Sequence, residues 1–243
     1  MNAPVEIVLV YQSLLGIYGD RGNAMVLRQR LARRGIDATL TIVEPGDAVP
    51  ATGSVYLLGG GEDAAQVSAV RALQADGHLF DALDRGAVLF AVCAGYQIVG
   101  KTFTVGDNDD VIEGLGLLDV TTRRGPERAV GEVLSHWTKP DGTASLITGF
   151  ENHGGFTYLG PDASPLARVE IGIGNCGDGT DGAAQGHVLG IYPHGPILAR
   201  NPELADHLLE LALGRELEPL PMPELDELRR QRVAAVRKAG LRR

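Results

Sequence analysis

The stretch that decides the fold runs from residue 88 to residue 100 and reads Val-Leu-Phe-Ala-Val-Cys-Ala-Gly-Tyr-Gln-Ile-Val-Gly. Its first five residues are apolar, which is typical of a strand buried inside a parallel sheet. Cys93 follows directly, with Ala91 two residues before it and Gly95 two residues after it. Small residues at this spacing indicate a nucleophile elbow, the sharp strand-to-helix turn that lifts one side chain above the sheet edge. We therefore predict that Cys93 is a nucleophile and not simply a core cysteine.

At such a turn the thiol lies at the start of the next helix. The helix dipole and free backbone N–H groups favour a thiolate there and can bind an oxyanion. The N–H of Ala94 is the first expected oxyanion donor. The second is expected from the glycine turn at residues 59–61, which ends a short apolar strand at residues 55–58. The sequence therefore predicts an ionised thiol beside an oxyanion hole.

The composition is that of an ordinary globular domain. The chain has 243 residues, of which 44% are hydrophobic, and its formal net charge is −9. This negative balance argues against non-specific nucleic-acid binding. Two cysteines make no disulfide framework, the first residues lack the pattern of a signal peptide, and no apolar run approaches the roughly 20 residues that span a bilayer. We therefore expect a cytoplasmic protein.

The first hundred residues alternate between strand-like and helix-like segments. We predict strands at residues 5–10, 38–43, 55–58 and 88–92, and helices at residues 24–34, 63–73 and 78–84. This order predicts a doubly wound parallel α/β sheet, in which active groups lie outside the carboxyl ends of the strands.

Beyond Gly100, strand-like stretches recur between glycine-rich turns, and a helix and a tail follow. We predict strands at residues 115–121, 129–134, 145–150, 167–173 and 187–192, and a helix at residues 201–213. We place one domain at residues 1–217, and a Pro-rich joint with a helical tail at residues 218–243. In the tail, acidic residues come first and basic residues last, which suits the dipole of a solvated terminal helix. Docking of the tail to a partner or to anionic lipid is the weaker hypothesis.

A thiol nucleophile needs a base, and histidine usually serves. Of six histidines, His194 follows a strand-like run and sits in a Pro-His-Gly-Pro frame, which places it at the same sheet edge as Cys93. His153 is the second candidate. Since no two histidines have the i, i+4 spacing of a helical zinc pair, we expect no metal.

Four motifs occur together in this chain. They are Gly-Gly-Gly-Glu-Asp at 59–63, Cys-Ala-Gly-Tyr-Gln at 93–97, Gly-Phe-Glu-Asn-His-Gly-Gly at 149–155 and Tyr-Pro-His-Gly-Pro at 192–196, preceded by a Tyr-Gly-Asp-Arg-Gly-Asn loop at 18–23. With them the chain resembles the cobyric-acid-synthase-like class I glutamine amidotransferases, and among these the GatD glutaminase subunits of lipid II isoglutaminyl synthase. The resemblance implies the flavodoxin-like doubly wound sheet of that class.

The resemblance also implies catalytic roles. Cys93 would attack the side-chain amide of L-glutamine, form a γ-glutamyl thioester and release ammonia. His194 would relay protons, and the N–H groups of Gly60 and Ala94 would stabilise the oxyanion.

Two further residues match positions that bind glutamine in the family. Gln97 would line the glutamine pocket. Arg128 would clamp the α-carboxylate, a task that suits the bidentate fork of a guanidinium. Many class I members carry a glutamate two residues after the histidine, where this chain has Pro196. A third catalytic member must come from elsewhere, from Glu151 or Asp20, or be missing.

The resemblance implies a partner as well. GatD-type subunits form a heterodimer with MurT, a Mur-ligase-like subunit that uses ATP to activate the stem-peptide D-glutamate of lipid II. Ammonia would convert this residue to D-isoglutamine. We therefore expect no cofactor in this chain, ATP and Mg²⁺ on the partner, and at most peripheral membrane contact through the lipid-linked substrate.

Two rival functions and one further motif bear on this assignment. Residues 95–102 match the phosphate-binding pattern G-x4-G-K-[ST], so a P-loop NTPase is an alternative, although bulky residues occupy the loop interior. A Cys–His hydrolase or peptidase on a similar fold is another. Residues 172–177 match G-x-G-x-x-G but are expected to form a hairpin turn, because no helix pattern follows.

Overall fold

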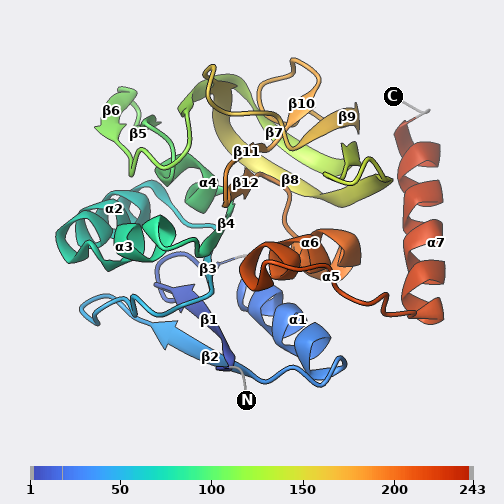
Figure 1. Ribbon diagram of the computed structural model, residues 1–243. Coiled ribbons are helices and arrows are strands. Elements are labelled where there is room, and N and C mark those ends of the chain that lie inside the picture. Colours follow the sequence, from blue (N-terminus) through green and yellow to red (C-terminus); the bar gives the residue numbers. More distant parts are fainter. Residues whose placement is uncertain (1–2, 18, 241–243) are drawn as a thin grey trace.

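The computed structural model describes residues 3–17 and 19–240. Tyr18 of the loop at 18–23 and the last three residues of the expected tail, 241–243, lie outside the described residues. The described chain contains two β-sheets, and helices pack on both faces of the first one (Figure 1).

The first sheet is the predicted doubly wound sheet, with strand order β11-β12-β4-β3-β1-β2. The strands from β12 to β2 are parallel, and β11 pairs antiparallel with β12 at one edge. The bounds are β1 (Val5–Val10), β2 (Ala38–Val43), β3 (Val55–Leu58), β4 (Val88–Val92), β11 (Ala183–Gln185) and β12 (Val188–Ile191). The first four agree with the sequence prediction.

Helices cover both faces of this sheet (Figure 1). One face carries α2 (Asp63–Asp76) and α3 (His78–Asp84), and the other carries α1 (Arg21–Ala32), α5 (Ile197–Arg200) and α6 (Pro202–Leu213). The short α4 (Ala94–Ile98) follows β4 directly. The predicted helices are confirmed, the one at 78–84 with the predicted ends and the others with shifted ends. The four-residue α5 was not predicted, because it is too short to show a helical period.

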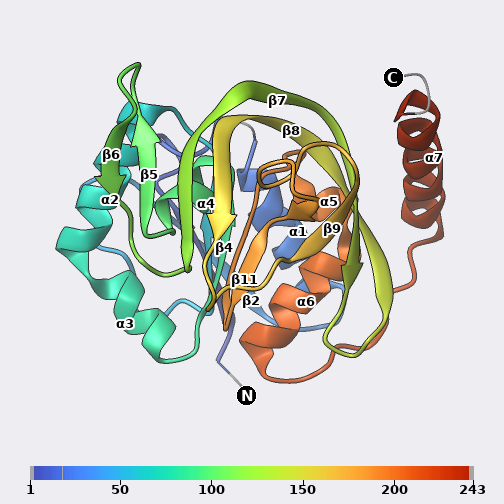
Figure 2. The same cartoon turned by 90° about the horizontal axis from the view of Figure 1, so that it is seen from above.

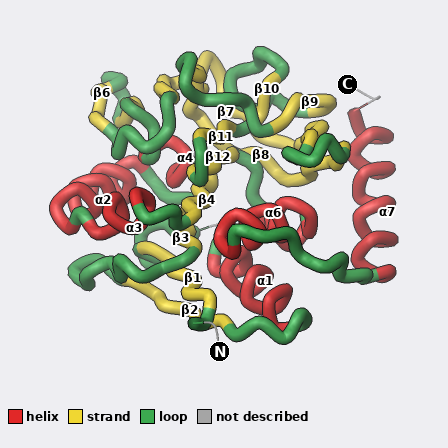
Figure 3. Tube along the Cα trace, in the orientation of Figure 1, coloured by secondary structure: helices red, strands yellow, loops and turns green. Residues whose placement is uncertain are grey.

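The second sheet is built on one long antiparallel hairpin (Figures 2 and 3). Its arms are β7 (Val120–Thr138) and β8 (Ala144–Leu159). The other strands are β5 (Thr102–Val105), β6 (Asp110–Glu113), β9 (Ala167–Ile171) and β10 (Thr180–Asp181). The short strands predicted at 129–134 and 145–150 are therefore parts of much longer ones.

One predicted strand is wrong over most of its length. Only the last residues of the stretch 115–121 belong to a strand, β7. The N–H groups of Leu115 and Leu117 donate to the carbonyls of Ile98 and Val99 at 2.8 and 2.9 Å. These leucines therefore pack on the end of α4 and do not extend a sheet, and the β5–β6 hairpin before them was missed.

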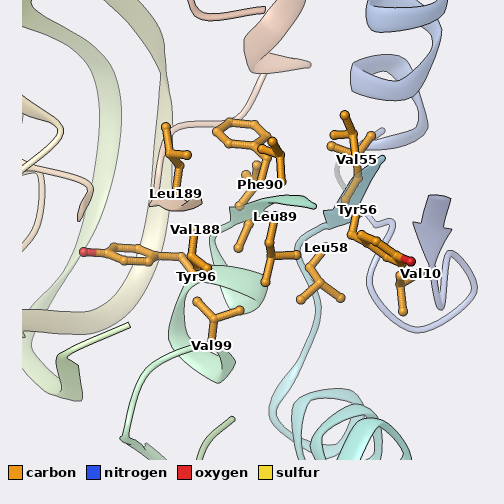
Figure 4. Packing of buried hydrophobic residues seen from close by; sticks show 14 of the residues in the cluster. Val10, Val55, Tyr56, Leu58, Leu89, Phe90, Tyr96, Val99, Val188 and Leu189 are labelled. Carbon is orange, nitrogen blue, oxygen red and sulfur yellow. The ribbon is translucent and has the colours of Figure 1, made fainter. Parts of the chain in front are cut away.

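The core surrounds β4, whose five residues are all buried. Figure 4 shows Leu89 and Phe90 of this strand among side chains of β3 and β12, with Tyr96 of α4 close by. Because helices or strands cover both faces of the sheet here, β4 has a continuous apolar run and no alternation.

The expected helical tail is α7 (Pro223–Gly240), which stands beside the second sheet (Figures 1 and 2). Val236 is its buried residue among those described. Ion pairs join it to the body: Arg229 with Glu203, Arg232 with Glu132 and Arg237 with Glu170. The helix is confirmed, but one side of it packs on the chain's own surface. The domain division at residue 217 stays a prediction.

None of the described helices is long and apolar enough to cross a lipid bilayer.

Candidate active site

Cys93 occupies the strand-to-helix turn between β4 and α4. Its φ is 54° and its ψ −107°, a strained backbone that L-residues rarely adopt and that recurs at functional sites. The Cys93 N–H donates to the carbonyl of Ile191 on β12 at 2.9 Å. A Cβ atom on Gly95 would lie 2.7 Å from the Leu58 carbonyl oxygen, so this position requires glycine. The geometry is that of the predicted elbow.

His194 lies at the same sheet edge as Cys93. β12 is parallel to β4 with Ile191 opposite Val92, so Cys93 and His194 both follow the carboxyl ends of neighbouring strands. The His194 N–H donates to the Phe150 carbonyl at 2.9 Å, which ties this segment to β8. Two distant parts of the chain are therefore brought to one edge, as the sequence predicts.

Burial keeps both groups neutral. It raises the pKa of the Cys93 thiol to about 12, against the opposing effect of the Ala94 N–H, and the residue is 7% exposed. Burial also lowers the pKa of His194 to about 4, and the neighbouring His153 and Arg128 lower it further. In the resting site burial therefore opposes the expected thiolate, because the sulfur is desolvated. A neutral imidazole is the form that can accept a proton.

A pocket of about 450 Å³ opens above the elbow. Cys93, Ala94, Gln97 and Arg128, four of the predicted site residues, line it. Gly60 lies next to the lining residue Gly61, and His194 is buried without lining the pocket. The remaining walls come from α2, the β5–β6 turn and β8, and carry several charged side chains. The pocket is therefore suited to a small polar or charged molecule.

Hydrogen bonds fix the side-chain amide of Gln97. Its Oε1 accepts a hydrogen bond from Gln66 Nε2 at 2.6 Å, and its Nε2 donates to the Tyr192 hydroxyl at 3.3 Å. Gly155 is needed beside it, since a Cβ there would collide with the amide. The sequence did not indicate that Gln66 and Tyr192 hold the Gln97 amide, because both lie far from Gln97 in the sequence.

Arg128 reaches the pocket from β7. Its Nε donates to Asn152 Oδ1 at 2.7 Å, which orients the guanidinium plane. The Arg128 charge lowers the pKa of both Cys93 and His194, although other effects on each pKa are larger. A guanidinium so placed can pair with a carboxylate of a bound molecule.

His153, the second candidate base, is held by other contacts. Its ring stacks on Tyr192 with centroids 3.6 Å apart. Its Nδ1 donates to the Gly155 carbonyl at 2.8 Å, which assigns the proton to that nitrogen, and its Nε2 lies 3.7 Å from a carboxylate oxygen of Glu151. The ring lines the pocket but directs its second nitrogen towards Glu151.

The two candidates for a third catalytic residue both bind backbone N–H groups. Glu151 accepts hydrogen bonds from Ile173 and Gly174 at 2.9 and 3.0 Å, so the G-x-G-x-x-G loop at 172–177 cradles the chain's own carboxylate. Asp20 accepts one from Gly60 at 2.9 Å. The identity of a third member stays a prediction.

The P-loop alternative is wrong. Residues 94–98 form a helix, and the N–H groups of Gln97, Val99 and Gly100 donate to the backbone carbonyls of Cys93, Gly95 and Gln97. No phosphate could use them. Lys101 Nζ pairs with Asp119 Oδ1 at 2.5 Å, outside the pocket. Among residues 3–17 and 19–240, no group of three or more His, Cys, Asp or Glu side chains is placed to hold a metal ion.

Known proteins share this sequence pattern and this architecture. The chain is 35% identical to the lipid II isoglutaminyl synthase (glutamine-hydrolyzing) subunit GatD of Staphylococcus aureus, over 87% of this chain and 86% of that protein. It is 32% identical to the subunit of the same name from Streptococcus pneumoniae, over 95% of this chain and 89% of that one.

A crystal structure of a glutamine amidotransferase superposes with a TM-score of 0.54 at 22% identity, covering 84% of this chain and 98% of that one. At this identity the likeness concerns the fold. Residues 6–202, most of the chain, match the CobB/CobQ-like glutamine amidotransferase domain. The elbow cysteine, the histidine on the neighbouring strand and these matches lead to one conclusion: the chain belongs to the CobB/CobQ-like glutamine amidotransferase family.

Proposed function

We propose that this chain is a glutaminase subunit that hydrolyses L-glutamine through a thioester on Cys93 and supplies ammonia to a ligase partner. The observation that carries the proposal is the placement of Cys93 and His194 after adjacent parallel strands, with a polar pocket above the sulfur.

The first half-reaction forms the thioester. Cys93 Sγ attacks the side-chain amide carbon of glutamine, and His194 takes the thiol proton as the carbon–sulfur bond forms. Because the resting pair is neutral, this transfer accompanies the attack and needs no preformed thiolate. Backbone N–H groups, that of Ala94 first, stabilise the oxyanion. His194 then gives the proton to the leaving nitrogen, and the carbon–nitrogen bond breaks to release ammonia.

The second half-reaction restores the enzyme. Water attacks the thioester carbon, and His194 accepts its proton. The tetrahedral intermediate collapses, the carbon–sulfur bond breaks, and the thiolate takes the proton back from His194 as glutamate leaves. The cycle uses only groups of this chain, and we propose that it needs no cofactor here.

Substrate recognition falls to Arg128 and Gln97. Arg128 pairs with the α-carboxylate of glutamine, which its charge and its anchoring by Asn152 favour. Gln97 presents an amide held by Gln66 and Tyr192 and lines the side-chain end of the pocket.

The partner in this proposal is a Mur-ligase-like subunit of the MurT type. The names of the two GatD relatives support a lipid II isoglutaminyl synthase. The partner would bind ATP and Mg²⁺ and amidate the stem-peptide D-glutamate of lipid II to D-isoglutamine in the cytoplasm. Lipid II would bring the complex to the membrane surface only peripherally.

The test is a glutamine assay with two cysteine variants. Wild type, Cys93→Ala and Cys176→Ala are incubated with glutamine, with and without the ligase subunit, and glutamate and ammonia are measured. Cys93→Ala should abolish both products, and Cys176→Ala, which removes the other thiol from a surface loop, should retain them. Turnover by Cys93→Ala, or cleavage of peptides or esters in preference to glutamine, would overturn the proposal.

A further inference from the structure

The N–H group of Gly60 is already in use. It donates to Oδ2 of Asp20 at 2.9 Å, and the bond is buried, with Asp20 only 3% exposed. Gly60 belongs to the 59–61 turn, from which the sequence predicts the second oxyanion donor. A backbone N–H that points at a carboxylate is not available to an oxyanion over Cys93.

The chain is shaped to make this contact. A Cβ atom on Gly59 would lie 2.5 Å from Asp20 Oδ2 and 2.6 Å from Asp20 Cβ, so only glycine lets the carboxylate approach. The Ile17 N–H donates to the Gly60 carbonyl at 3.4 Å, which binds the β1–α1 loop to the same turn. Asp20 precedes α1 but makes no side-chain cap bond to that helix. Its carboxylate is therefore directed to the glycine turn.

The charge of Asp20 opposes the chemistry at Cys93. After burial, the Asp20 carboxylate is one of the groups that raise the pKa of the Cys93 thiol, so its field reaches the sulfur. The same field disfavours an oxyanion at the adjacent carbon. Burial raises the pKa of Asp20 itself to about 6, which leaves the group ionised at pH 7.5. A hydrogen bond from an N–H to an ionised carboxylate is also stronger than one to a neutral acceptor.

We propose that Asp20 is a positioning residue that holds the Gly60 N–H away from the reacting carbon, so that the free chain hydrolyses glutamine slowly until Asp20 releases this group. The inference rests on the proposed glutaminase function. Asp20 does not line the pocket, so its effect falls on the rate of the chemical step and leaves glutamine binding unchanged.

The experiment compares wild type with Asp20→Asn, which keeps the shape and an acceptor but removes the charge. The bond to a neutral acceptor is weaker, so kcat for glutamine should rise about tenfold at pH 7.5 with KM unchanged. Asp81→Asn, an exposed change of the same charge on α3, is the control and should match wild type. A lowered or unchanged kcat in Asp20→Asn would overturn the proposal, because a structural or directly catalytic role predicts loss.

Two further measurements separate this inference from the glutaminase proposal. Iodoacetamide modification of Cys93, followed by peptide mass spectrometry, should be faster in Asp20→Asn, even if glutamine is not the substrate. Equal modification rates would count against the charge effect. In crystals of wild type reacted with 6-diazo-5-oxo-L-norleucine, the Gly60 nitrogen should lie beyond hydrogen-bond distance of Asp20 and face the adduct oxygen. An intact Asp20–Gly60 bond in that adduct would refute the inference for wild type, whatever the variant does.

Discussion

Replacing Asp181 by asparagine should change how the stability of this chain depends on pH. The Asp181 side chain is fully buried near β7 and accepts a 2.7 Å hydrogen bond from the Ser135 hydroxyl. Its other carboxylate oxygen, Oδ1, has no hydrogen-bond partner among the described residues. Burial raises the pKa of this carboxyl from 3.8 to about 6, although the Ser135 bond lowers it.

The sign and size of the effect follow from that rise. Between pH 3.8 and about 6 the folded chain holds a proton on Asp181 that the unfolded chain has lost. The contribution of Asp181 to the free energy of unfolding is therefore fully present below pH 3.8 and is lost as the pH rises through about 6. A tenfold change in an equilibrium constant is worth about 1.4 kcal/mol, so the total loss by pH 7 is about 3 kcal/mol.

The assay is urea unfolding of wild type and Asp181→Asn at pH 4, 5, 6 and 7, followed by circular dichroism. An asparagine cannot ionise, so the wild-type free energy of unfolding should fall relative to the variant by about 2 kcal/mol between pH 4 and pH 7, because part of the total loss has already occurred at pH 4. Asp162→Asn, an exposed change, should show no such trend. If the wild-type and Asp181→Asn values run parallel across this range, the buried carboxyl does not titrate as the structure indicates and the reasoning fails.

Other variants test separate parts of the structure. Gly190→Ala places a Cβ against the buried Tyr96 ring and should lower the free energy of unfolding by about 1–3 kcal/mol, as measured in urea. Arg128→Lys keeps the positive charge but loses the bidentate guanidinium, so KM for glutamine should rise about tenfold with kcat little changed. A fall in kcat alone would contradict a role in ground-state binding. Arg229→Ala removes the bonds of α7 to Glu203 and Leu146, and limited proteolysis should then cut at residues 219–223 while the body stays intact.

The central sheet could be predicted because its signals are local. The apolar runs of β3 and β4 are short, continuous and bounded by turn residues. β1 is apolar apart from Glu6, β2 alternates between apolar and polar residues, and the ends of all four strands were placed correctly. The edge shared by Cys93 and His194 followed from one rule about parallel strands. Each of these inferences needs only the residues of one or two segments.

The strands of the second sheet were harder to predict, because glycines inside them allow close packing and do not mark turns. In β8, Gly149 faces Pro193 and Gly155 faces Gln97, and a Cβ at either would collide with that neighbour. Read along the sequence, the same glycines indicate turns and cut one long strand into pieces. Only the partner surfaces distinguish a glycine that permits close approach from a glycine that permits a turn.

Within the site, the residue types were predictable but their surroundings were not. The spacing around Cys93 indicated the elbow, while the desolvation that keeps its thiol protonated depends on packing from several elements. The bond from Gly60 to Asp20 spans forty positions of sequence and has no motif of its own. The glycine loop at 172–177 was correctly separated from dinucleotide sites, but its cradle for Glu151 was not foreseen.

The attachment of α7 to the rest of the chain should depend on ionic strength. The helix buries Val236 but otherwise adheres largely through arginine–carboxylate pairs at or near the surface. Dissolved ions screen such pairs, and the screening length shrinks from about 10 Å at 0.1 M salt to about 3 Å at 1 M. Concentrated salt should therefore loosen α7 while the apolar packing of the doubly wound sheet grows no weaker, so the two parts of the fold respond to the same solution in different ways.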